Sequence, residues 1–179
     1  MGWELALLDA LQSLHGSFWD MLMVWITSLA NGGIFWLLLA AALIMLGNRD
    51  KKQWGLSILL ALVFSFVTVN LLLKPAVDRI RPFTYRPDLL LLVPVPRDAS
   101  FPSGHSSVSF AGALSIYLYD KKWGILALLL AVLIAFSRLY LYVHFPTDVL
   151  FGAAMGCVCA CASHTCLARL GRGKKGESV

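Results

Sequence analysis

The stretch Trp54-Gly-Leu-Ser-Ile-Leu-Leu-Ala-Leu-Val-Phe-Ser-Phe-Val-Thr-Val-Asn-Leu-Leu-Leu73 contains no charged residue. As an α-helix rising 1.5 Å per residue, it would cross the hydrocarbon core of a bilayer, which is about 30 Å thick. The whole chain of 179 residues shares this character, because 59% of its residues are hydrophobic and only 14% are charged. Such a composition excludes a soluble globular protein. It predicts an all-α fold in one domain, residues 1–179, built as a polytopic bundle of membrane helices.

Further apolar segments predict further crossings. Residues 17–46 would extend about 45 Å as one helix, which is long for a bilayer, and Asn31-Gly32-Gly33 in their middle is a turn signal. We interpret them as two short helices meeting at a turn, although one span or two stays open. With residues 3–14 as an interfacial helix, we expect about six crossings: Phe18–Ala30, Ile34–Leu46, Trp54–Leu73, Ser103–Tyr119, Trp123–Val143 and Thr147–Ala168.

The net charge of +5 comes from clusters of basic residues that flank apolar segments. This placement is typical of topology determinants, and we expect no nucleic-acid partner. Cytoplasmic loops are enriched in lysine and arginine, so the sequence predicts a multi-pass cell-membrane protein with these loops and the C-terminus inside. The clusters are Arg49, Lys51 and Lys52; Lys121 and Lys122; and Arg169, Arg172, Lys174 and Lys175.

The segment 74–101 holds five of the seven prolines and is predicted to be an irregular loop on the outer side. It begins with Lys74, Arg79 and Arg81 just past an apolar helix, against the usual charge bias. Ammonium and guanidinium groups together suit a phosphoryl group, whereas lipid headgroup anchoring is the alternative explanation. Apart from Lys74 and Arg81, we interpret five charges of this loop as solvated: Asp78, Arg79, Arg86, Arg97 and Asp98.

Two more motifs fall at the predicted outer ends of helices. Pro102-Ser103-Gly104-His105 opens one helix, where glycine and free N–H groups suit an anion, although a helix cap with a buried histidine would explain it too. Arg138, His144 and Asp148 lie between two apolar runs, where ionisable groups are costly and often functional. A carboxylate beside an imidazole leaves the other ring nitrogen free, which suggests phosphoryl transfer through a phosphohistidine. We interpret Tyr140 and Tyr142 as interface aromatics.

Cysteine is confined to the last apolar segment, at Cys157, Cys159, Cys161 and Cys166. Side chains on one membrane helix are poorly placed to bridge each other, so we expect free thiols in small-residue packing. Cys157, Cys161 and His164 would share a helix face, but packing explains that spacing without a metal. We expect no metal and no cofactor.

The three motifs together resemble the signature of the type 2 phosphatidic acid phosphatases, a superfamily that includes the vanadium haloperoxidases. Lys74-x6-Arg81-Pro82, Pro102-Ser103-Gly104-His105 and Ser137-Arg138-x5-His144-x3-Asp148 match in order and spacing, and the resemblance covers about residues 54–168. Among small bacterial members, the chain is most similar to undecaprenyl pyrophosphate and phosphatidylglycerophosphate phosphatases.

The resemblance implies an enzyme that hydrolyses a lipid phosphate or diphosphate at the outer leaflet without a metal. It implies that His144 is the nucleophile, that Asp148 orients its ring and that His105 protonates the leaving oxygen. Phosphate-binding roles fall on Lys74, Arg81, Ser103, Gly104 and Arg138. Undecaprenyl diphosphate is the expected substrate, with phosphatidylglycerophosphate, phosphatidic acid and lipid A phosphates as alternatives. A haloperoxidase and a non-enzymatic membrane protein are the more distant alternatives, and the sequence does not predict the oligomeric state.

Overall fold

The structure, a computed structural model, describes residues 2–176, with side chains to Leu170. Its described part contains helices joined by loops and no strand. The elements in chain order are α1 (Gly2–Gln12), α2 (Ser17–Ser28), η1 (Asn31–Gly33), α3 (Ile34–Leu46), α4 (Arg49–Ser65), η2 (Phe66–Leu73), α5 (Lys74–Val77), η3 (Pro82–Tyr85), α6 (Gly104–Tyr117), α7 (Lys121–Tyr140) and α8 (Pro146–Gly176).

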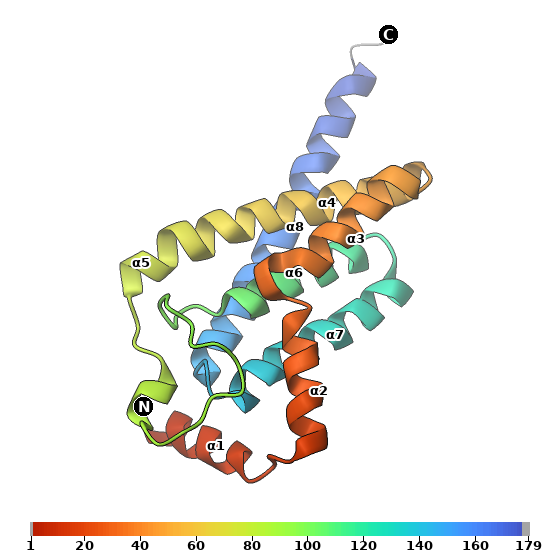
Figure 1. The fold of residues 1–179 in the computed structure, drawn as a ribbon. Helices are drawn as coiled ribbons and strands as arrows, with labels where there is room; N and C mark the ends of the chain where they lie inside the picture. The colour runs from red at the N-terminus through yellow and green to blue at the C-terminus, as the bar shows by residue number, and fades with distance from the viewer. Residues whose placement is uncertain (1, 177–179) are drawn as a thin grey trace.

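Helix α6 lies in the middle of the bundle, between α4, α7 and α8 (Figure 1). Its buried positions are mostly serine, alanine and glycine. Apolar side chains gain little by leaving lipid for another apolar surface, so membrane helices rely on small residues that let backbones approach. A Cβ atom added at Gly156 of α8 would lie 2.3 Å from the carbonyl oxygen of Ser107, and one at Gly112 would lie 2.5 Å from Trp36. These close contacts fix where α6 begins, and therefore where His105 lies.

Among the described residues, three helical segments are long and apolar enough to cross a membrane, namely Arg49–Tyr85, Lys121–Tyr140 and Pro146–Leu170. Helices α2 and α3 differ in direction by 45° at the Asn31–Gly33 break and together give at most one broken span. The two-helix prediction therefore holds for the elements but not for two separate crossings. Each helix is short, with 12 and 13 residues, and the bend lets them continue along one path instead of folding back. The predicted total of six crossings is not confirmed.

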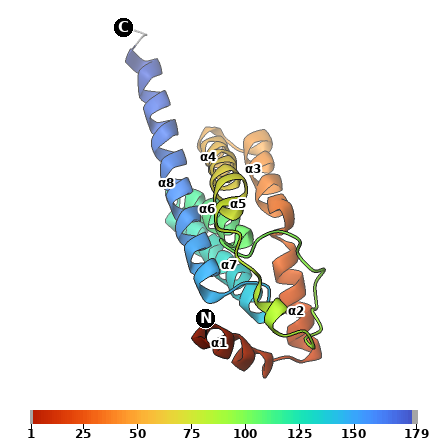
Figure 2. The ribbon, with the colours of Figure 1, turned by 90° about the vertical axis from the view of Figure 1, so that its left-hand side faces the viewer.

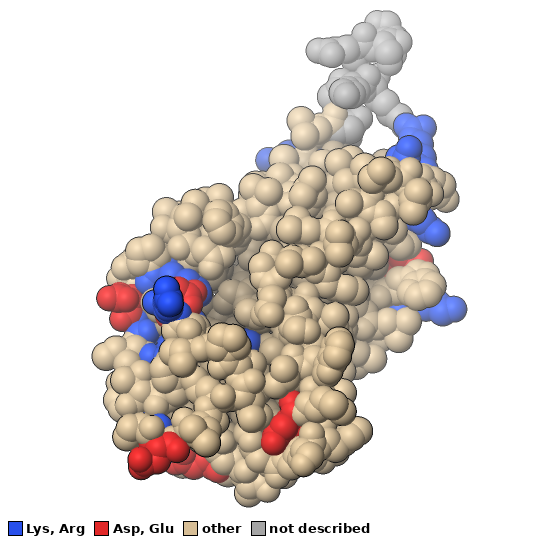
Figure 3. Space-filling view, viewed as in Figure 1, with Lys and Arg blue, Asp and Glu red and all other residues tan. Residues whose placement is uncertain are grey.

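The loops divide between the two ends of the bundle. The start of α6, the end of α7 and the start of α8 lie at one end, together with α5 and α1 (Figures 1 and 2). The α3–α4 and α6–α7 connections lie at the other end, as does the C-terminus. On the face seen in Figure 3, charged side chains also gather toward the two ends of the bundle, and a surface without charged residues lies between the two groups. The three motifs thus meet at one end, and two of the basic clusters lie at the other. Arg172, Lys174 and Lys175 of the third cluster lie outside the described side chains.

A π-helical segment, η2, interrupts the long helix that begins as α4. Such wide turns, with i→i+5 hydrogen bonds, are rare and often found at functional sites. Ser65 just before the segment is fully buried and hydrogen-bonded to Ser107 at 2.6 Å. Lys74 just after it is also buried, although it carries a charge. The segment therefore ends at the first cation of the predicted site.

Candidate active site

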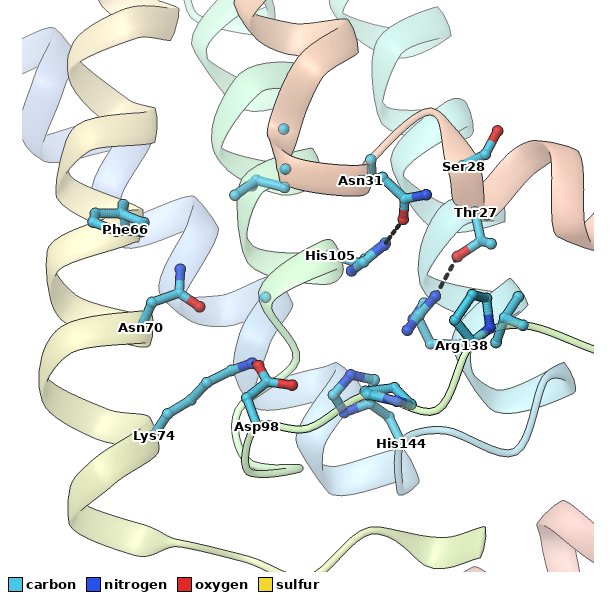
Figure 4. A pocket seen from close by; sticks show the side chains of 18 of the residues that line it. Thr27, Ser28, Asn31, Phe66, Asn70, Lys74, Asp98, His105, Arg138 and His144 are labelled. Atoms are coloured by element: carbon cyan, nitrogen blue, oxygen red, sulfur yellow. Dashed lines mark hydrogen bonds and ion pairs between the residues drawn. The ribbon is translucent and has the colours of Figure 1, made fainter. Parts of the chain in front are cut away.

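Six of the predicted site residues line one cavity of about 840 Å³, as Figure 4 shows in part. They come from four separate stretches of the chain: Lys74, Arg81, Gly104 and His105, and Arg138 with His144. The remaining wall is largely apolar and comes from α2, α3, α4 and the loop before α6, including Val24, Leu37, Leu62, Phe66 and Val95. The cavity thus combines a cationic end with a hydrophobic wall.

His144 follows the last turn of α7 and is only 1% exposed. Its Nε2 atom lies 3.3 Å from Nη1 of Arg81. A guanidinium can only donate, so Nε2 is the unprotonated nitrogen and the proton resides on Nδ1. Burial, together with the nearby charges of Arg81 and Arg138, lowers the pKa of His144 to about 3, against the opposing effect of Asp148. The ring is therefore neutral at physiological pH, with a lone pair on the nitrogen nearest Arg81.

Asp148, in the first turn of α8, is fully buried and lies on the other side of this ring. Its Oδ2 atom is 3.7 Å from Nδ1 of His144, which has no other partner among the described residues. The same oxygen accepts hydrogen bonds from Ser100 Oγ at 2.5 Å and from the backbone N–H of Phe145 at 2.9 Å. The other oxygen accepts from Nη1 of Arg79 at 2.5 Å. Asp148 is thus held in place from three directions.

Asp98 joins the two cations of the first motif. It pairs with Nζ of Lys74, and its Oδ1 accepts from Nη2 of Arg81 at 2.7 Å. Arg81 also donates to the carbonyl oxygens of Asp98 and Val143, each at 2.8 Å. Burial raises the pKa of Asp98, but the hydrogen bond and charge of Lys74, with those of Arg81, lower it to about 2 overall. Our interpretation of Arg79 as a solvated loop charge was wrong, because it pairs with the buried carboxylates of Glu4 and Asp148. The side chain of Asp98 is 53% exposed, as a solvated charge would be, but it also pairs with both cations.

Two polar residues of the bent span complete the cavity. Asn31 Oδ1 lies 2.9 Å from Nε2 of His105, and Thr27 Oγ1 accepts from Nη1 of Arg138 at 2.5 Å (Figure 4). Nε of Arg138 is buried without a partner among the described residues. The sequence predicts only a turn at Asn31 and no role for Thr27. No local pattern marks either residue, because both contacts depend on where the bend places α2.

Ser103 and Gly104 hold the N-terminus of α6 against the cavity. Ser103 is fully buried and does not line the cavity; its Oγ caps the helix by accepting from the N–H of Ser106 at 3.4 Å. At Gly104, an added Cβ would approach Asn70 to 3.5 Å and Nζ of Lys74 to 3.9 Å. The missing side chain therefore keeps the cationic end of the cavity open.

Two tyrosines that the sequence placed at the membrane interface are buried instead. Tyr140 and Tyr142 are each 1% exposed. Tyr140 Oη donates to Asp20 at 2.6 Å, and Tyr142 Oη donates to Asp9 at 2.6 Å. Because both acceptors belong to the N-terminal helices, these tyrosines attach α1 and α2 to the end of α7.

The described residues include no group of three histidine, cysteine or carboxylate side chains that could hold a metal ion. The four cysteines are free thiols, as the sequence predicts. The cavity instead offers three cations and two histidines around one open volume. Fixed donors of this kind stabilise the charge on phosphoryl oxygens, and a neutral imidazole can attack phosphorus.

Comparisons with known proteins agree with this chemistry. The chain is 35% identical over 116 residues to an undecaprenyl-diphosphatase of Sulfolobus acidocaldarius, covering 64% of this chain and 55% of that protein. It is 33% identical over 155 residues to a lipid A 4'-phosphatase of Bacteroides thetaiotaomicron, covering 80% of this chain and 67% of that protein. The match thus spans about half the length of the Sulfolobus relative.

The fold is similar to the crystal structure of Aquifex aeolicus LpxE, with a TM-score of 0.78 and 29% sequence identity, over 90% of this chain and 94% of that chain. Residues 54–172, which contain all three motifs, match the PAP2 superfamily. The chain therefore belongs to the PAP2 superfamily.

Proposed function

We propose that this protein is an integral membrane phosphatase that hydrolyses a lipid phosphate or diphosphate through a phosphohistidine. The observation that carries the proposal is the single cavity in which Lys74, Arg81, Arg138, His105 and His144 meet beside an apolar wall. The cationic end suits the phosphoryl group, and the wall suits an acyl or prenyl chain.

In this mechanism Nε2 of His144 attacks phosphorus in line, and the bond to the leaving oxygen breaks. His105 donates a proton to that oxygen, which departs as an alcohol or as the remaining phosphate. Asp148 stabilises the imidazolium that forms, in the way that a buried carboxylate supports a catalytic histidine elsewhere. A water molecule then attacks the phosphohistidine, with His105 taking its proton, and inorganic phosphate leaves.

The phosphate-binding roles go to Lys74, Arg81 and Arg138, together with the backbone N–H of Gly104. Ser103, expected to bind phosphate as well, does not line the cavity and instead caps α6. Lys74 and Arg81 are held by Asp98, which leaves each cation only partly neutralised. Preorganised donors of this kind typically contribute about 3 kcal/mol each to transition-state stabilisation.

Undecaprenyl diphosphate is the substrate we favour, with phosphatidylglycerophosphate, phosphatidic acid and lipid A phosphates as alternatives. A long prenyl chain fits the apolar wall formed by α4 and the loop before α6. The site would face the extracytoplasmic side, because the starts of α4 and α7 lie at the other end of the bundle and carry Lys51, Lys52, Lys121 and Lys122. Helix α1 would then lie at the outer interface.

Phosphate release from a panel of these purified lipids, with His144→Ala as the matched inactive variant, tests the proposal. Release from at least one lipid by the wild type, and none by the variant, supports it. Equal release by both would show that the activity does not depend on this cavity. The order of rates within the panel separates the candidate substrates.

A further inference from the structure

We infer, on the basis of the phosphatase function proposed above, that Glu4 of α1 and Arg79 act as a positioning pair for Asp148. The N-terminal helix would then take part in catalysis through Arg79, without touching the substrate. Glu4, which is outside the range that matches the family, is 4% exposed and thus buried despite its charge. A buried carboxylate needs a compensating partner, and the partner here leads directly to the active site.

Arg79 lies between the two carboxylates. Its Nη2 donates to Oε2 of Glu4 at 2.8 Å, while its Nη1 donates to Oδ1 of Asp148 at 2.5 Å. The carbon of the guanidinium also lies 4.0 Å from the centre of the Phe145 ring. The planar group is therefore fixed on one face by the ring and along its edge by both carboxylates, an arrangement that a lysine could not reproduce.

Glu4 is connected to α8 by a second route. Its Oε1 accepts from Oγ1 of Thr147 at 2.6 Å and from the backbone N–H of Thr147 at 3.4 Å. Thr147 Oγ1 in turn lies 2.7 Å from Nη1 of Arg79. Glu4, Arg79 and the first turn of α8 thus form a closed set of contacts around the residue that precedes Asp148.

The contacts of Glu4 and Arg79 determine how one of the two carboxylate oxygens of Asp148 is held. Ser100 and the N–H of Phe145 occupy Oδ2, and only Arg79 occupies Oδ1 among the described contacts. Without the negative charge of Glu4, the guanidinium would be drawn wholly toward Asp148, and its angle to that carboxylate would change. A shift of about 1 Å at a catalytic group can slow the chemical step roughly a hundredfold. Substrate binding would change little, because neither Glu4 nor Arg79 lines the cavity.

The chain offers a matched control on the same helix. Asp9 also ties α1 to the site end of the bundle, by accepting from Tyr142 Oη at 2.6 Å and from Nη2 of Arg86 at 2.5 Å. It does not contact Arg79 or Asp148 in any described hydrogen bond. Asp9→Asn therefore weakens the docking of α1 without changing the charge beside Arg79.

The experiment measures kcat and KM for the full chain in detergent, using the best lipid from the panel. We expect Glu4→Gln to lower kcat about tenfold while KM stays within about twofold, and Arg79→Lys to lower kcat by more. Glu4→Asp should recover part of the loss, and Asp9→Asn should keep the wild-type kcat. Thermal unfolding midpoints identify variants that fail to fold. If Glu4→Gln fails to fold, Arg79→Lys tests the positioning pair instead, by the same comparison of a lowered kcat with an unchanged KM.

A wild-type kcat in Glu4→Gln, or an equal loss of kcat in Asp9→Asn, would overturn the positioning pair and leave α1 a structural helix. A rise in KM without a fall in kcat would also overturn it, because that pattern belongs to a binding residue. If the wild type released no phosphate from any lipid, the proposed function would fail instead, so the two failures are distinguishable.

Discussion

Nδ1 of His144 faces Oδ2 of Asp148 at 3.7 Å, close enough for an ion pair but longer than a hydrogen bond. Charge on the imidazole would shorten this contact, because the carboxylate attracts an imidazolium more strongly than a neutral ring. In the proposed mechanism, Asp148 would therefore act more on the phosphorylated intermediate than on the resting enzyme.

The first prediction follows from this geometry. Asp148→Asn should lower kcat by roughly three orders of magnitude while KM changes little, because the amide keeps the shape but cannot stabilise the imidazolium. Steady-state phosphate release measures both constants. A kcat within about tenfold of the wild type would show that Asp148 has no such role.

A second prediction concerns stability and pH. Burial lowers the pKa of His144 to about 3, below the value of about 6.5 for a histidine in an unfolded chain. Between these two values the unfolded chain binds a proton that the folded protein does not, so stability is present above pH 6.5 and is lost as the pH falls toward 3. The unfolding midpoint in detergent should therefore drop between pH 7 and pH 5, and His144→Gln should reduce that drop. If the unfolding midpoint of His144→Gln dropped as much as that of the wild type, the drop would not come from the titration of His144.

A third prediction concerns the carboxylate beside the cations. Asp98 has a pKa of about 2 and remains charged at any assay pH, so it competes with an incoming phosphate for Lys74 and Arg81. Asp98→Asn should strengthen inhibition by inorganic phosphate several-fold, while the amide oxygen can still accept from Arg81. Asp88→Asn, in the same loop, is the control. Weaker inhibition would mean that Asp98 mainly positions the cations.

A fourth prediction concerns the packing of α8 on α6. Gly156→Ala would place a methyl group 2.3 Å from the backbone oxygen of Ser107, so the helices must separate. We expect a loss of about 1–3 kcal/mol in stability and lower activity, since α6 carries His105 and α8 carries Asp148. Gly16→Ala is the control, because no atom lies within 4 Å of its added Cβ. Equal unfolding midpoints for the two variants would show that the contact relaxes freely.

A fifth prediction tests which side the site faces. Leu90, in the loop before α6, is 89% exposed, and Lys51 belongs to the first turn of α4, which lies at the opposite end of the bundle. In a background with the four native cysteines replaced, Leu90→Cys should react with an impermeant thiol reagent in intact cells. Lys51→Cys should react only after lysis. The reverse pattern would place the cavity on the cytoplasmic side.

The sequence could predict the motif residues of the cavity because helix ends at one face of a bundle must lie near each other. Lys74, His105 and His144 each lie at the end of an apolar run, so the topology alone brings them together. The family resemblance then assigns them roles, which geometry alone would not do. Residues 54–168, on which that resemblance rests, also agree with the matched range 54–172.

Residues 1–46 were harder to predict, and for a physical reason. Hydropathy reports whether a segment prefers lipid but not whether a break bends it by 45° or turns it back. For the same reason, hydropathy could not predict the contacts of Asn31 and Thr27, because these contacts depend on the angle of the bend. The ion pairs of Arg79 and Asp98 could not be predicted, because a charge in a proline-rich loop looks the same in sequence whether or not an opposite charge lies beside it.

The wide turns of η2 determine the direction in which Lys74 points. Lys74 lies nine positions after Ser65, which is about two and a half turns of a regular α-helix, so an ideal helical wheel would place the two on opposite sides. At roughly 4.5 residues per turn, the same interval makes about two complete turns, and both residues face the protein interior, as observed. Straightening this segment into an ideal transmembrane helix would preserve its hydropathy and yet rotate the lysine out toward the acyl chains.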